Sequence, residues 1–355
     1  MRIAFDVSPL SHPLSGVGNY IRGSLAGLVE AAAGRHEIVA FAPTSPAGKR
    51  AIPEALEGID VETRVGLLPF AHGWRTAWSR LQWPPAERFL GPFDVLHFTD
   101  WMYPPQRAGL RSTMVHDLVP LHFPDWVQKR TESMHGAKYR HMVEACDVIF
   151  TNSEFTAADV AGTLGVPEER LHVAHPGADG FSPEGPRASL DRPYALTVAT
   201  LEPRKNLSTL VAGYRLLDAD LALALAGGKG WGEQPELDVP GVERLDYLAH
   251  DELPDWYRGA SVFVYPSRFE GFGMPIVEAM ACGAPVVASA HPSLDEASGV
   301  VAVRADPEDP GAIAVAIEGA IGERERLAAA GIEHASRFTW RAAGEIMLAG
   351  YEGAR

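Results

Sequence analysis

The sequence has 355 residues, of which 46% are hydrophobic and 22% are charged, as in ordinary soluble globular proteins. This length exceeds what one hydrophobic core usually supports, so we expect two domains. Lys and Arg total 31 against 46 Asp and Glu, and the resulting net charge of −15 argues against general binding to nucleic acid.

The sequence contains no clear targeting segment and only two cysteines. No stretch approaches the roughly 18 apolar residues of a membrane span, and the first apolar run is too short for a signal peptide. Cys146 and Cys282 each lie in an apolar, helix-like run, which favours structural packing in a reducing compartment over a disulfide or a metal site. These observations predict a cytoplasmic protein.

The first half of the chain alternates short apolar runs with helical patterns. Strands are predicted at 2–7, 37–42, 61–65, 94–98, 112–116 and 148–152, and helices at 19–33, 128–145 and 154–164. The loop before the first helix contains Gly16 and Gly18, which would let the backbone approach a ligand closely. His116 ends a strand, where it would donate a hydrogen bond to a bound group or to a turn carbonyl.

The segment 67–89 combines aromatic and basic residues. Its aromatic and apolar members are Phe70, Trp74, Trp78, Leu81 and Trp83, and they alternate with Arg75, Arg80 and Arg88. One interpretation is a helix at a membrane interface beside a lipid-linked acceptor, with the protein peripheral at the inner face of the membrane. The other, favoured by Glu87 and the two prolines at 84–85, is an amphipathic helix packed on its own sheet.

A second half follows a segment rich in proline, serine and charge at 181–192, which is the predicted linker. Strands are predicted at 194–199, 222–226, 242–245, 262–265 and 300–303, and helices at 206–215, 251–260, 276–282, 310–322 and 323–337. The pattern predicts an α/β fold of two Rossmann-like, doubly wound domains that face each other across a cleft.

The stretch 262–289 contains two carboxylates, Glu270 and Glu278, separated by seven residues. Gly271, Gly273 and Pro275 interrupt any continuous helix, so Glu270 is expected in a loop and Glu278 near the start of a helix. Carboxylates accept hydrogen bonds from hydroxyls and repel phosphates, so the pair suggests a polyol ligand. Backbone N–H groups of the loop 271–274 would add further hydrogen bonds.

Arg204 and Lys205 precede the first helix of the second half. Cations are disfavoured at a helix N-terminus unless an anion binds there, so we expect these residues to hold a diphosphate. The alternative is a pair of solvated surface charges.

The motifs EGFGMPIVEAMACGAPVVAS, LEPRKNL, SGVGNYI, VHDLVP, TNSEFTAADV and PGADGFSP occur in this order along nearly the whole chain. Together they resemble the retaining glycosyltransferases of family 4, with the GT-B fold, and in particular bacterial mannosyltransferase-like members. The resemblance implies an acceptor-binding domain at 1–180, the linker at 181–192, a nucleotide-sugar-binding domain at 193–337 and a closing helix at 338–355 that crosses back to the N-terminal domain.

The resemblance also implies roles for single residues. Glu270 would contact the hydroxyls of the donor sugar, Glu278 the ribose, and Arg204 and Lys205 the diphosphate, with His116 facing the donor from the other domain. The catalytic set implied in this way is His116, Arg204, Lys205 and Glu270. The donor-binding set is Gly16, Gly18, Gly228, Glu270, Gly271, Phe272, Gly273, Met274 and Glu278.

Family members of this type need no metal or other cofactor, and their partners are a nucleotide-sugar donor and a sugar or lipid-linked acceptor. Thr200 stands where many relatives carry a second phosphate-binding arginine, which favours GDP-mannose as donor, with UDP-sugars next. The segment 293–297 resembles the family segment that follows the helix of Glu278, but it has Asp295 where family members usually have proline. The oligomeric state stays open. Two alternatives to glycosyl transfer also stay open, a nucleotide-sugar epimerase of the same fold and a non-catalytic nucleotide-sugar binder.

Overall fold

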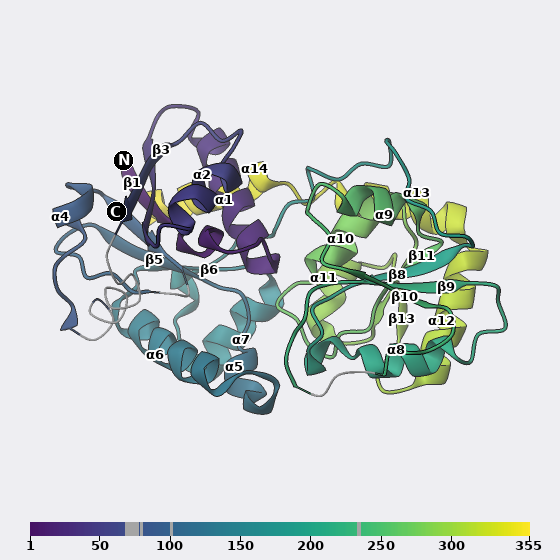
Figure 1. The fold of residues 1–355 in the computed structure, drawn as a ribbon. Helices are drawn as coiled ribbons and strands as arrows, with labels where there is room; N and C mark the ends of the chain where they lie inside the picture. The colour runs from purple at the N-terminus through teal and green to yellow at the C-terminus, as the bar shows by residue number, and fades with distance from the viewer. Residues whose placement is uncertain (68–77, 79–80, 100–101, 233–235) are drawn as a thin grey trace. The chain divides into compact units, whose positions relative to one another are not determined.

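The computed structural model describes residues 1–67, 78, 81–99, 102–232 and 236–355. The chain folds into two compact units, each shown by its elements in Figure 1. The first contains Met1–Leu121, Lys129–Gly177 and Thr339–Arg355, and the second contains His122–Gln128 and Ala178–Phe338. The sequence analysis left His122–Gln128 in the N-terminal domain, whereas these residues pack with the second unit.

The first unit is built on a parallel sheet with the order β3-β2-β1-β4-β5-β6-β7. Its strands are β1 (Arg2–Asp6), β2 (Glu37–Thr44), β3 (Glu62–Leu67), β4 (Val95–Phe98), β5 (Leu110–Val115), β6 (Val148–Thr151) and β7 (Leu171–Val173). The strand order reverses direction beside β1, which is the usual arrangement of a doubly wound α/β domain.

The helices of the first unit follow the same alternation with the strands. They are α1 (Gly16–Ala32), α2 (Gly48–Ala55), α4 (Glu87–Leu90), α6 (Lys129–Ala145), α7 (Glu154–Leu164) and α14 (Trp340–Gly353), with short turns η1 (Ser8–Ser11) and η3 (Glu168–Arg170). Two further short elements, α5 (Val119–His122) and η2 (Pro124–Trp126), lie where the chain passes to the second unit. The last helix, α14, packs on α1 although more than 300 residues separate them.

The second unit repeats this plan with the parallel order β10-β9-β8-β11-β12-β13. Its strands are β8 (Tyr194–Val198), β9 (Ala222–Ala226), β10 (Val242–Asp246), β11 (Val262–Tyr265), β12 (Val286–Ser289) and β13 (Val303–Ala305). Its helices are α8 (Leu207–Tyr214), α9 (Leu253–Gly259), α10 (Met274–Ala281), α11 (Asp295–Ser298), α12 (Pro310–Gly322) and α13 (Arg324–Ala335), with turns η4 (Pro203–Lys205) and η5 (Pro292–Leu294).

Both faces of the second sheet are buried, which explains the continuous apolar strands of this half. Successive residues of β8 point to opposite faces, so Leu196 joins the core beneath α9 and α10 while Ala195 joins the core beneath α8 and α12. Cys282 belongs to the first of these cores. Both cysteines are buried and unbonded to each other, as the sequence predicted.

Two expectations from the sequence need correction or fall outside the described residues. Helix α1 begins at Gly16, so Gly16 and Gly18 lie in its first turn and not in the preceding loop. The predicted helix at 67–89 lies mostly outside the described residues. Within it, Trp78 is buried in the core of the first unit with Leu90 and Phe93, whereas Leu81 is 73% exposed.

Among the described residues, no helix is long and apolar enough to cross a membrane.

Candidate functional site

The strand order of the second sheet brings two loops together. Because β8 and β11 are neighbours, the turn η4 after β8 meets the loop 266–273 after β11. The backbone N–H of Arg268 donates to the carbonyl of Arg204 at 2.9 Å. Asn206, which adopts a left-handed conformation at the start of α8, donates from its side chain to the carbonyl of Pro266 at 3.1 Å. These bonds fix one loop against the other.

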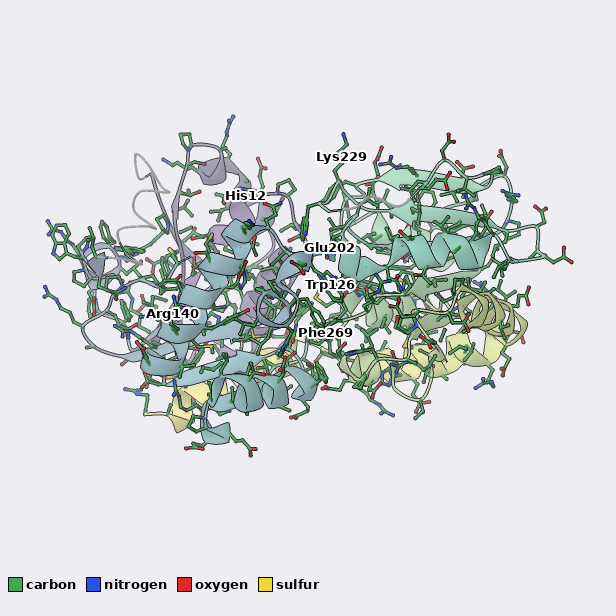
Figure 2. The ribbon with its side chains drawn as sticks, turned by 90° about the horizontal axis from the view of Figure 1, so that it is seen from below. His12, Trp126, Arg140, Glu202, Lys229 and Phe269 are labelled. Atoms are coloured by element: carbon green, nitrogen blue, oxygen red, sulfur yellow. The ribbon has the colours of Figure 1, made fainter. Side chains whose placement is uncertain are left out.

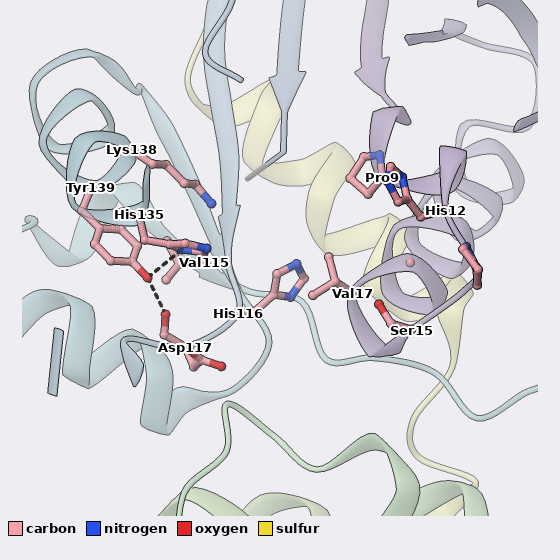
Figure 3. Close-up of a pocket in the computed structure, with 12 residues that line it drawn as sticks. Pro9, His12, Ser15, Val17, Val115, His116, Asp117, His135, Lys138 and Tyr139 are labelled. Carbon is pink, nitrogen blue, oxygen red and sulfur yellow. Dashed lines mark hydrogen bonds between the residues drawn. The ribbon is translucent and has the colours of Figure 1, made fainter. Parts of the chain in front are cut away.

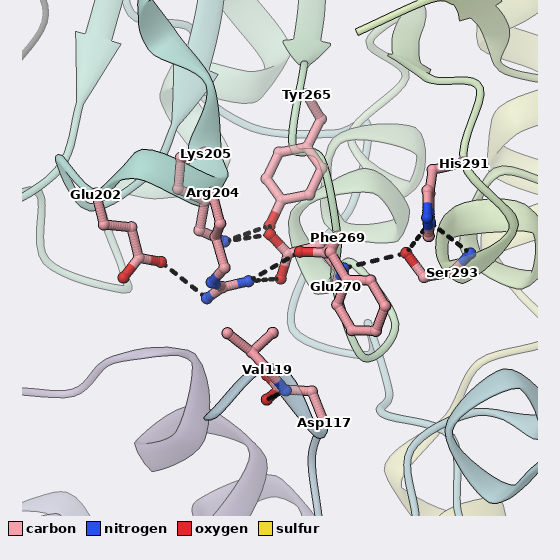
Figure 4. Close-up of polar contacts among 10 residues, drawn as sticks. All are labelled: Asp117, Val119, Glu202, Arg204, Lys205, Tyr265, Phe269, Glu270, His291 and Ser293. Atoms are coloured by element: carbon pink, nitrogen blue, oxygen red, sulfur yellow. Dashed lines mark hydrogen bonds and ion pairs between the residues drawn. The ribbon is translucent and has the colours of Figure 1, made fainter. Parts of the chain in front are cut away.

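The carboxylate of Glu270 lies at the centre of this junction (Figure 4). Its Oε1 accepts from Lys205 Nζ at 2.5 Å and from the Tyr265 hydroxyl at 3.1 Å, and its Oε2 pairs with the guanidinium of Arg204. Glu270 is 7% exposed and Lys205 8% exposed, so water screens the pairing only weakly. The interpretation of Arg204 and Lys205 as solvated surface charges is therefore wrong.

These contacts set the protonation states of the cluster. Burial raises the pKa of Glu270, but Arg204 and Lys205 outweigh burial and lower that pKa to about 2. Burial and Arg204 oppose protonation of Lys205, yet Glu270 and Tyr265 leave the pKa of Lys205 raised. The carboxylate and both cations are thus charged at neutral pH.

A fourth charge completes the cluster, because Arg204 also pairs with Glu202 at 2.9 Å. Two cations therefore face two carboxylates. The sequence analysis assigned the cations to a phosphate and the acids to hydroxyls, as separate duties, whereas in the structure Arg204 and Lys205 bond Glu270 directly. Arg204 and Lys205 lie in η4, just before α8, which begins at Leu207, as the sequence predicted.

Glu278 occupies a different environment on α10. It is 4% exposed, and the hydroxyl of Tyr257 donates to its Oε2 at 3.0 Å. Burial raises the pKa of Glu278 to about 7, although the bond from Tyr257 opposes that rise. Glu270 and Glu278 therefore differ in charge behaviour, since one is firmly ionised and the other titrates near neutral pH.

The loop between the two acids presents backbone more than side chains. Phe272 packs its ring into the core against Phe338, so only its backbone is offered to a ligand. Gly273 has φ +98° at the start of α10, and a Cβ there would lie 2.8 Å from Leu294 Cδ2, so only glycine fits. Gly271 is buried and Met274 is half-buried at the first helical position.

Gly228 follows β9, the other neighbour of β8. Its carbonyl accepts from the backbone N–H of Leu201 at 3.3 Å, and a Cβ at this position would meet nothing within 4 Å. The preceding residue, Gly227, is more constrained, because a Cβ there would lie 1.9 Å from the carbonyl oxygen of Ala199. Glu202 and Lys229, labelled in Figure 2, mark these strand-end loops.

In the first unit, His116 and Gly18 line a cavity of about 240 Å³ (Figure 3). Its wall also includes His12, Ser15 and residues of α6. The ring of His116 lies edge-on to Tyr20, with centroids 5.1 Å apart. Gly16 is exposed at the first position of α1 and does not line this cavity. That His116 faces a donor bound to the other domain stays a prediction, because it involves both units.

Part of the cavity wall is a hydrogen-bonded series on α6. The Tyr139 hydroxyl donates to the carbonyl of Asp117 at 3.0 Å and lies 3.2 Å from His135 Nδ1. Because the hydroxyl proton is directed at Asp117, His135 Nδ1 is the donor in the second bond. Lys138 also lines the cavity; it is fully buried and donates to the carbonyl of Met114 at 2.5 Å.

Sequence reasoning missed three hydroxyl residues that hold the acids in place. Tyr265 ends a predicted strand, and its position beside Glu270 could have been suspected from that. Tyr257 lies in a predicted helix with no feature that distinguishes it from a core aromatic. No pattern in the sequence points to Ser293, yet its hydroxyl accepts a hydrogen bond from the backbone N–H of Glu270 at 3.1 Å. Among the described residues, no group of three or more His, Cys, Asp or Glu could hold a metal ion.

In comparisons with known proteins, both halves of the chain match glycosyltransferase families. Residues 14–179 match the family Glycosyltransferase Family 4, and residues 192–323 match Glycosyl transferases group 1. The O-antigen chain mannosyltransferase B of Escherichia coli is 30% identical over 381 residues, covering 96% of each chain. A D-inositol 3-phosphate glycosyltransferase of Catenulispora acidiphila is 34% identical over 252 residues, covering 60% of this chain and 59% of the relative.

Solved structures share the fold at lower identity. Sucrose-phosphate synthase of Thermosynechococcus elongatus superimposes with a TM-score of 0.74 at 19% identity, covering 99% of this chain and 98% of the other. Anabaena HepE, solved with UDP and glucose, gives a TM-score of 0.70 at 16% identity, covering 99% and 100%. The two Rossmann-like domains predicted from the sequence are confirmed, and they are of the GT-B type.

Proposed function

Because this chain belongs to the glycosyltransferases of family 4, with the GT-B fold and a resemblance to bacterial mannosyltransferases, we propose that it transfers a hexose from a nucleoside-diphosphate sugar to an acceptor hydroxyl with retention of anomeric configuration. The observation that carries the proposal is the buried cluster of Arg204, Lys205 and Glu270 at the ends of β8 and β11. It combines cations for a diphosphate with a carboxylate for hydroxyls at one point.

The charges of the cluster support a donor that carries two phosphates. Without a ligand, Arg204 divides its guanidinium between Glu202 and Glu270, so its charge is already balanced. A diphosphate would draw Arg204 and Lys205 toward itself, and their charge would stabilise the leaving group as the glycosidic bond breaks, with no metal required. Glu278, with a pKa of about 7, would accept hydrogen bonds from the ribose hydroxyls in its ionised form.

The sugar and base of the donor are proposed on weaker grounds. We favour GDP-mannose, because the relative that matches 96% of its length is a mannosyltransferase and because Thr200 replaces the second arginine of many family members. UDP-sugars come next, since the structural neighbour HepE has been solved with UDP-glucose. The acceptor hydroxyl would belong to a saccharide, free or lipid-linked, bound in the first unit at the cavity that His116 lines.

For the chemical step we propose a front-face reaction. Glu270 is held by two cations and a hydroxyl and has a pKa of about 2, so it is a poor nucleophile and a poor base. The departing phosphate oxygen would instead take the proton of the acceptor hydroxyl while the sugar passes through an oxocarbenium-like state. Trapping of a covalent glycosyl-enzyme would contradict this step.

A thermal-shift panel of GDP-, UDP- and ADP-sugars tests the proposal, followed by NMR of the product anomer. A specific donor at a hundredfold excess over its Kd should add about 2.7 kcal/mol to the free energy of unfolding. Lys205→Met should remove most of that shift and most of the activity, whereas Arg107→Ala, which changes an exposed arginine of the first unit, should retain both. Equal losses in the two variants, or binding without any transfer or donor hydrolysis, would contradict the proposal.

A further inference from the structure

The residues that follow β12 form a compact turn around the side chain of His291. This histidine precedes η5, and its Nδ1 accepts the backbone N–H of Ser293 at 3.2 Å. The Ser293 hydroxyl lies 2.9 Å from the same nitrogen. A backbone N–H can only donate, so Nδ1 carries no proton and the ring is the neutral tautomer with its proton on Nε2.

The hydroxyl of Ser293 connects His291 to the backbone of Glu270 through hydrogen bonds. Its oxygen accepts the backbone N–H of Glu270 at 3.1 Å, so its own proton is free to point at His291 Nδ1. Ser293 is 2% exposed and Glu270 7% exposed, which leaves little water to substitute for these bonds. Figure 4 shows the resulting series from imidazole to hydroxyl to the backbone of Glu270.

The surroundings of His291 favour the neutral ring. Its imidazole packs against Phe269, with centroids 5.4 Å apart. Arg304, from β13, donates to the carbonyl of His291 at 2.9 Å and pairs with Asp295 of α11 at 3.0 Å. Burial lowers the pKa of His291, Asp295 opposes that change and Arg304 reinforces it. The charged groups that face the ring from its neighbouring elements are thus Asp295, Arg304 and, through Ser293, Glu270.

Phe269 links the same point to a segment that is distant in sequence. Its ring lies edge-on to Phe123, 5.3 Å away, and Phe123 stacks on Trp126 at 4.1 Å. The carbonyl of Trp126 accepts from Trp231 Nε1 at 2.6 Å, and Trp126 and Phe269 are both labelled in Figure 2. The ring of Phe269 is thus held by aromatic contacts, and the backbone N–H of the next residue, Glu270, is held by Ser293.

We propose that His291 and Ser293 are positioning residues for sugar transfer, in which the neutral imidazole of His291 orients the Ser293 hydroxyl and this hydroxyl holds the backbone of Glu270 so that its carboxylate meets the donor sugar. The inference rests on the proposed function, in which Glu270 receives the hydroxyls of that sugar. Protonation of His291 would turn Nδ1 into a donor and break its bond to the Ser293 N–H, and the turn that places the Ser293 hydroxyl on the Glu270 N–H would lose this support. Transfer should therefore weaken at acid pH as His291 becomes charged.

Three variants test the series. Ser293→Ala and His291→Ala should each lower kcat about three- to tenfold, the effect of one buried hydrogen bond between neutral groups. His291→Asn should regain most of the activity that His291→Ala loses, because an asparagine oxygen can accept the Ser293 N–H in the same N-terminal position. The acid limb of the wild-type pH profile that His291 causes should be absent in His291→Asn. Ser336→Ala, at an exposed serine of the same unit, is the matched control.

Binding measurements separate positioning from simple loss of structure. Affinity for the bare nucleoside diphosphate should be unchanged in Ser293→Ala, while affinity for the intact nucleotide sugar should fall, because only the sugar uses Glu270. Equal loss for both ligands, or identical pH profiles in wild type and His291→Asn, would overturn the inference.

A separate readout does not depend on activity. Nitrogen-15 NMR of the imidazole should show His291 with an unprotonated Nδ1 at neutral pH, and a proton on Nδ1 there would also overturn the inference. If instead the wild-type protein bound no nucleotide sugar while His291 showed the expected tautomer, the proposed function would fail and the hydrogen-bonded series would stand.

Discussion

Glu278 is the residue whose environment most directly sets a pH dependence. Burial raises the pKa of its carboxyl from 4.5 to about 7. The folded protein therefore binds this proton more tightly than the unfolded chain, so the free energy of unfolding falls as the pH rises from about 4.5 to about 7. Above that range the ionised carboxylate stays buried with one hydrogen bond from Tyr257, at the expense of stability.

Glu278→Gln should remove this penalty while keeping an oxygen that accepts from Tyr257. At about 1.4 kcal/mol per pH unit, the variant should gain up to about 3 kcal/mol over wild type at about pH 8 and little at about pH 4. Denaturant unfolding at the two pH values measures the difference. Glu318→Gln, which changes an exposed acid of α12, should show no such pH-dependent gain. A constant difference at both pH values would mean that Glu278 does not titrate between them.

At this scale the sequence singled out residues that the structure brings together, but it did not predict how they pair. The motif identified Arg204, Lys205 and Glu270, but it assigned the cations and the acid to separate ligand groups. Their direct pairing depends on the bond between Arg268 and Arg204, which holds one loop against the other, and no local pattern encodes that bond. The roles of Tyr257 and Ser293 were missed for the same reason, since a hydroxyl acquires its function from residues distant in sequence.

At the scale of elements, the strands were the easiest to predict and the helix ends the hardest. The strands Ala222–Ala226 and Val262–Tyr265 match their predicted bounds. Both are buried on their two faces, so the apolar run in the sequence has the same bounds as the strand. Helix α1 was predicted to start three residues late. Glycine has a low helix propensity, so Gly16 and Gly18 suggested a loop, whereas the helix of the structure includes both.

The same helix shows why its other glycines are needed. A Cβ at Gly27 would lie 1.7 Å from the carbonyl oxygen of Trp340, which belongs to α14. Gly27→Ala should therefore force α14 away from α1 and destabilise the protein by about 1–3 kcal/mol, as overpacking of a core does.

Gly162→Ala is the matched control for Gly27→Ala, because Gly162 also lies within a helix of the first unit but has nothing within 4 Å of its Cβ position. That substitution should stabilise the protein by up to about 1 kcal/mol through helix propensity. Thermal unfolding of both variants measures the contrast. Equal effects would show that α1 and α14 do not approach each other as closely as the structure indicates.

At the scale of the whole molecule, each unit is made of segments that are not continuous in the sequence. The chain enters the second unit at His122–Gln128, returns to the first, enters the second again at Ala178 and ends with α14 in the first. The first unit is therefore incomplete until the last residues have been added. Its core includes Tyr351, whose ring packs edge-on against Phe150 of β6 at 5.4 Å.

Substitutions at two neighbouring residues of α14 test whether the packing of this helix stabilises the first unit. Ile346 is 43% exposed, whereas its neighbour Met347 is 1% exposed. The difference arises because the buried stripe runs through the small residues Ala343 and Gly344, where α14 meets α1. Met347→Ala should cost about 2–5 kcal/mol, whereas Ile346→Ala should stay within about 0.5 kcal/mol of wild type.

Hydrogen exchange would locate the effect of Met347→Ala. Because Met347 packs within the first unit, amides of α1 and of β6 should lose protection while those of β8, β9 and β11 keep theirs. Loss of protection in both units to the same extent would show that they unfold as one cooperative body. In the expected case, the loops of the second unit that carry Arg204 and Glu270 keep their structure when the first unit is weakened, so the proposed binding of the bare nucleoside diphosphate should survive Met347→Ala.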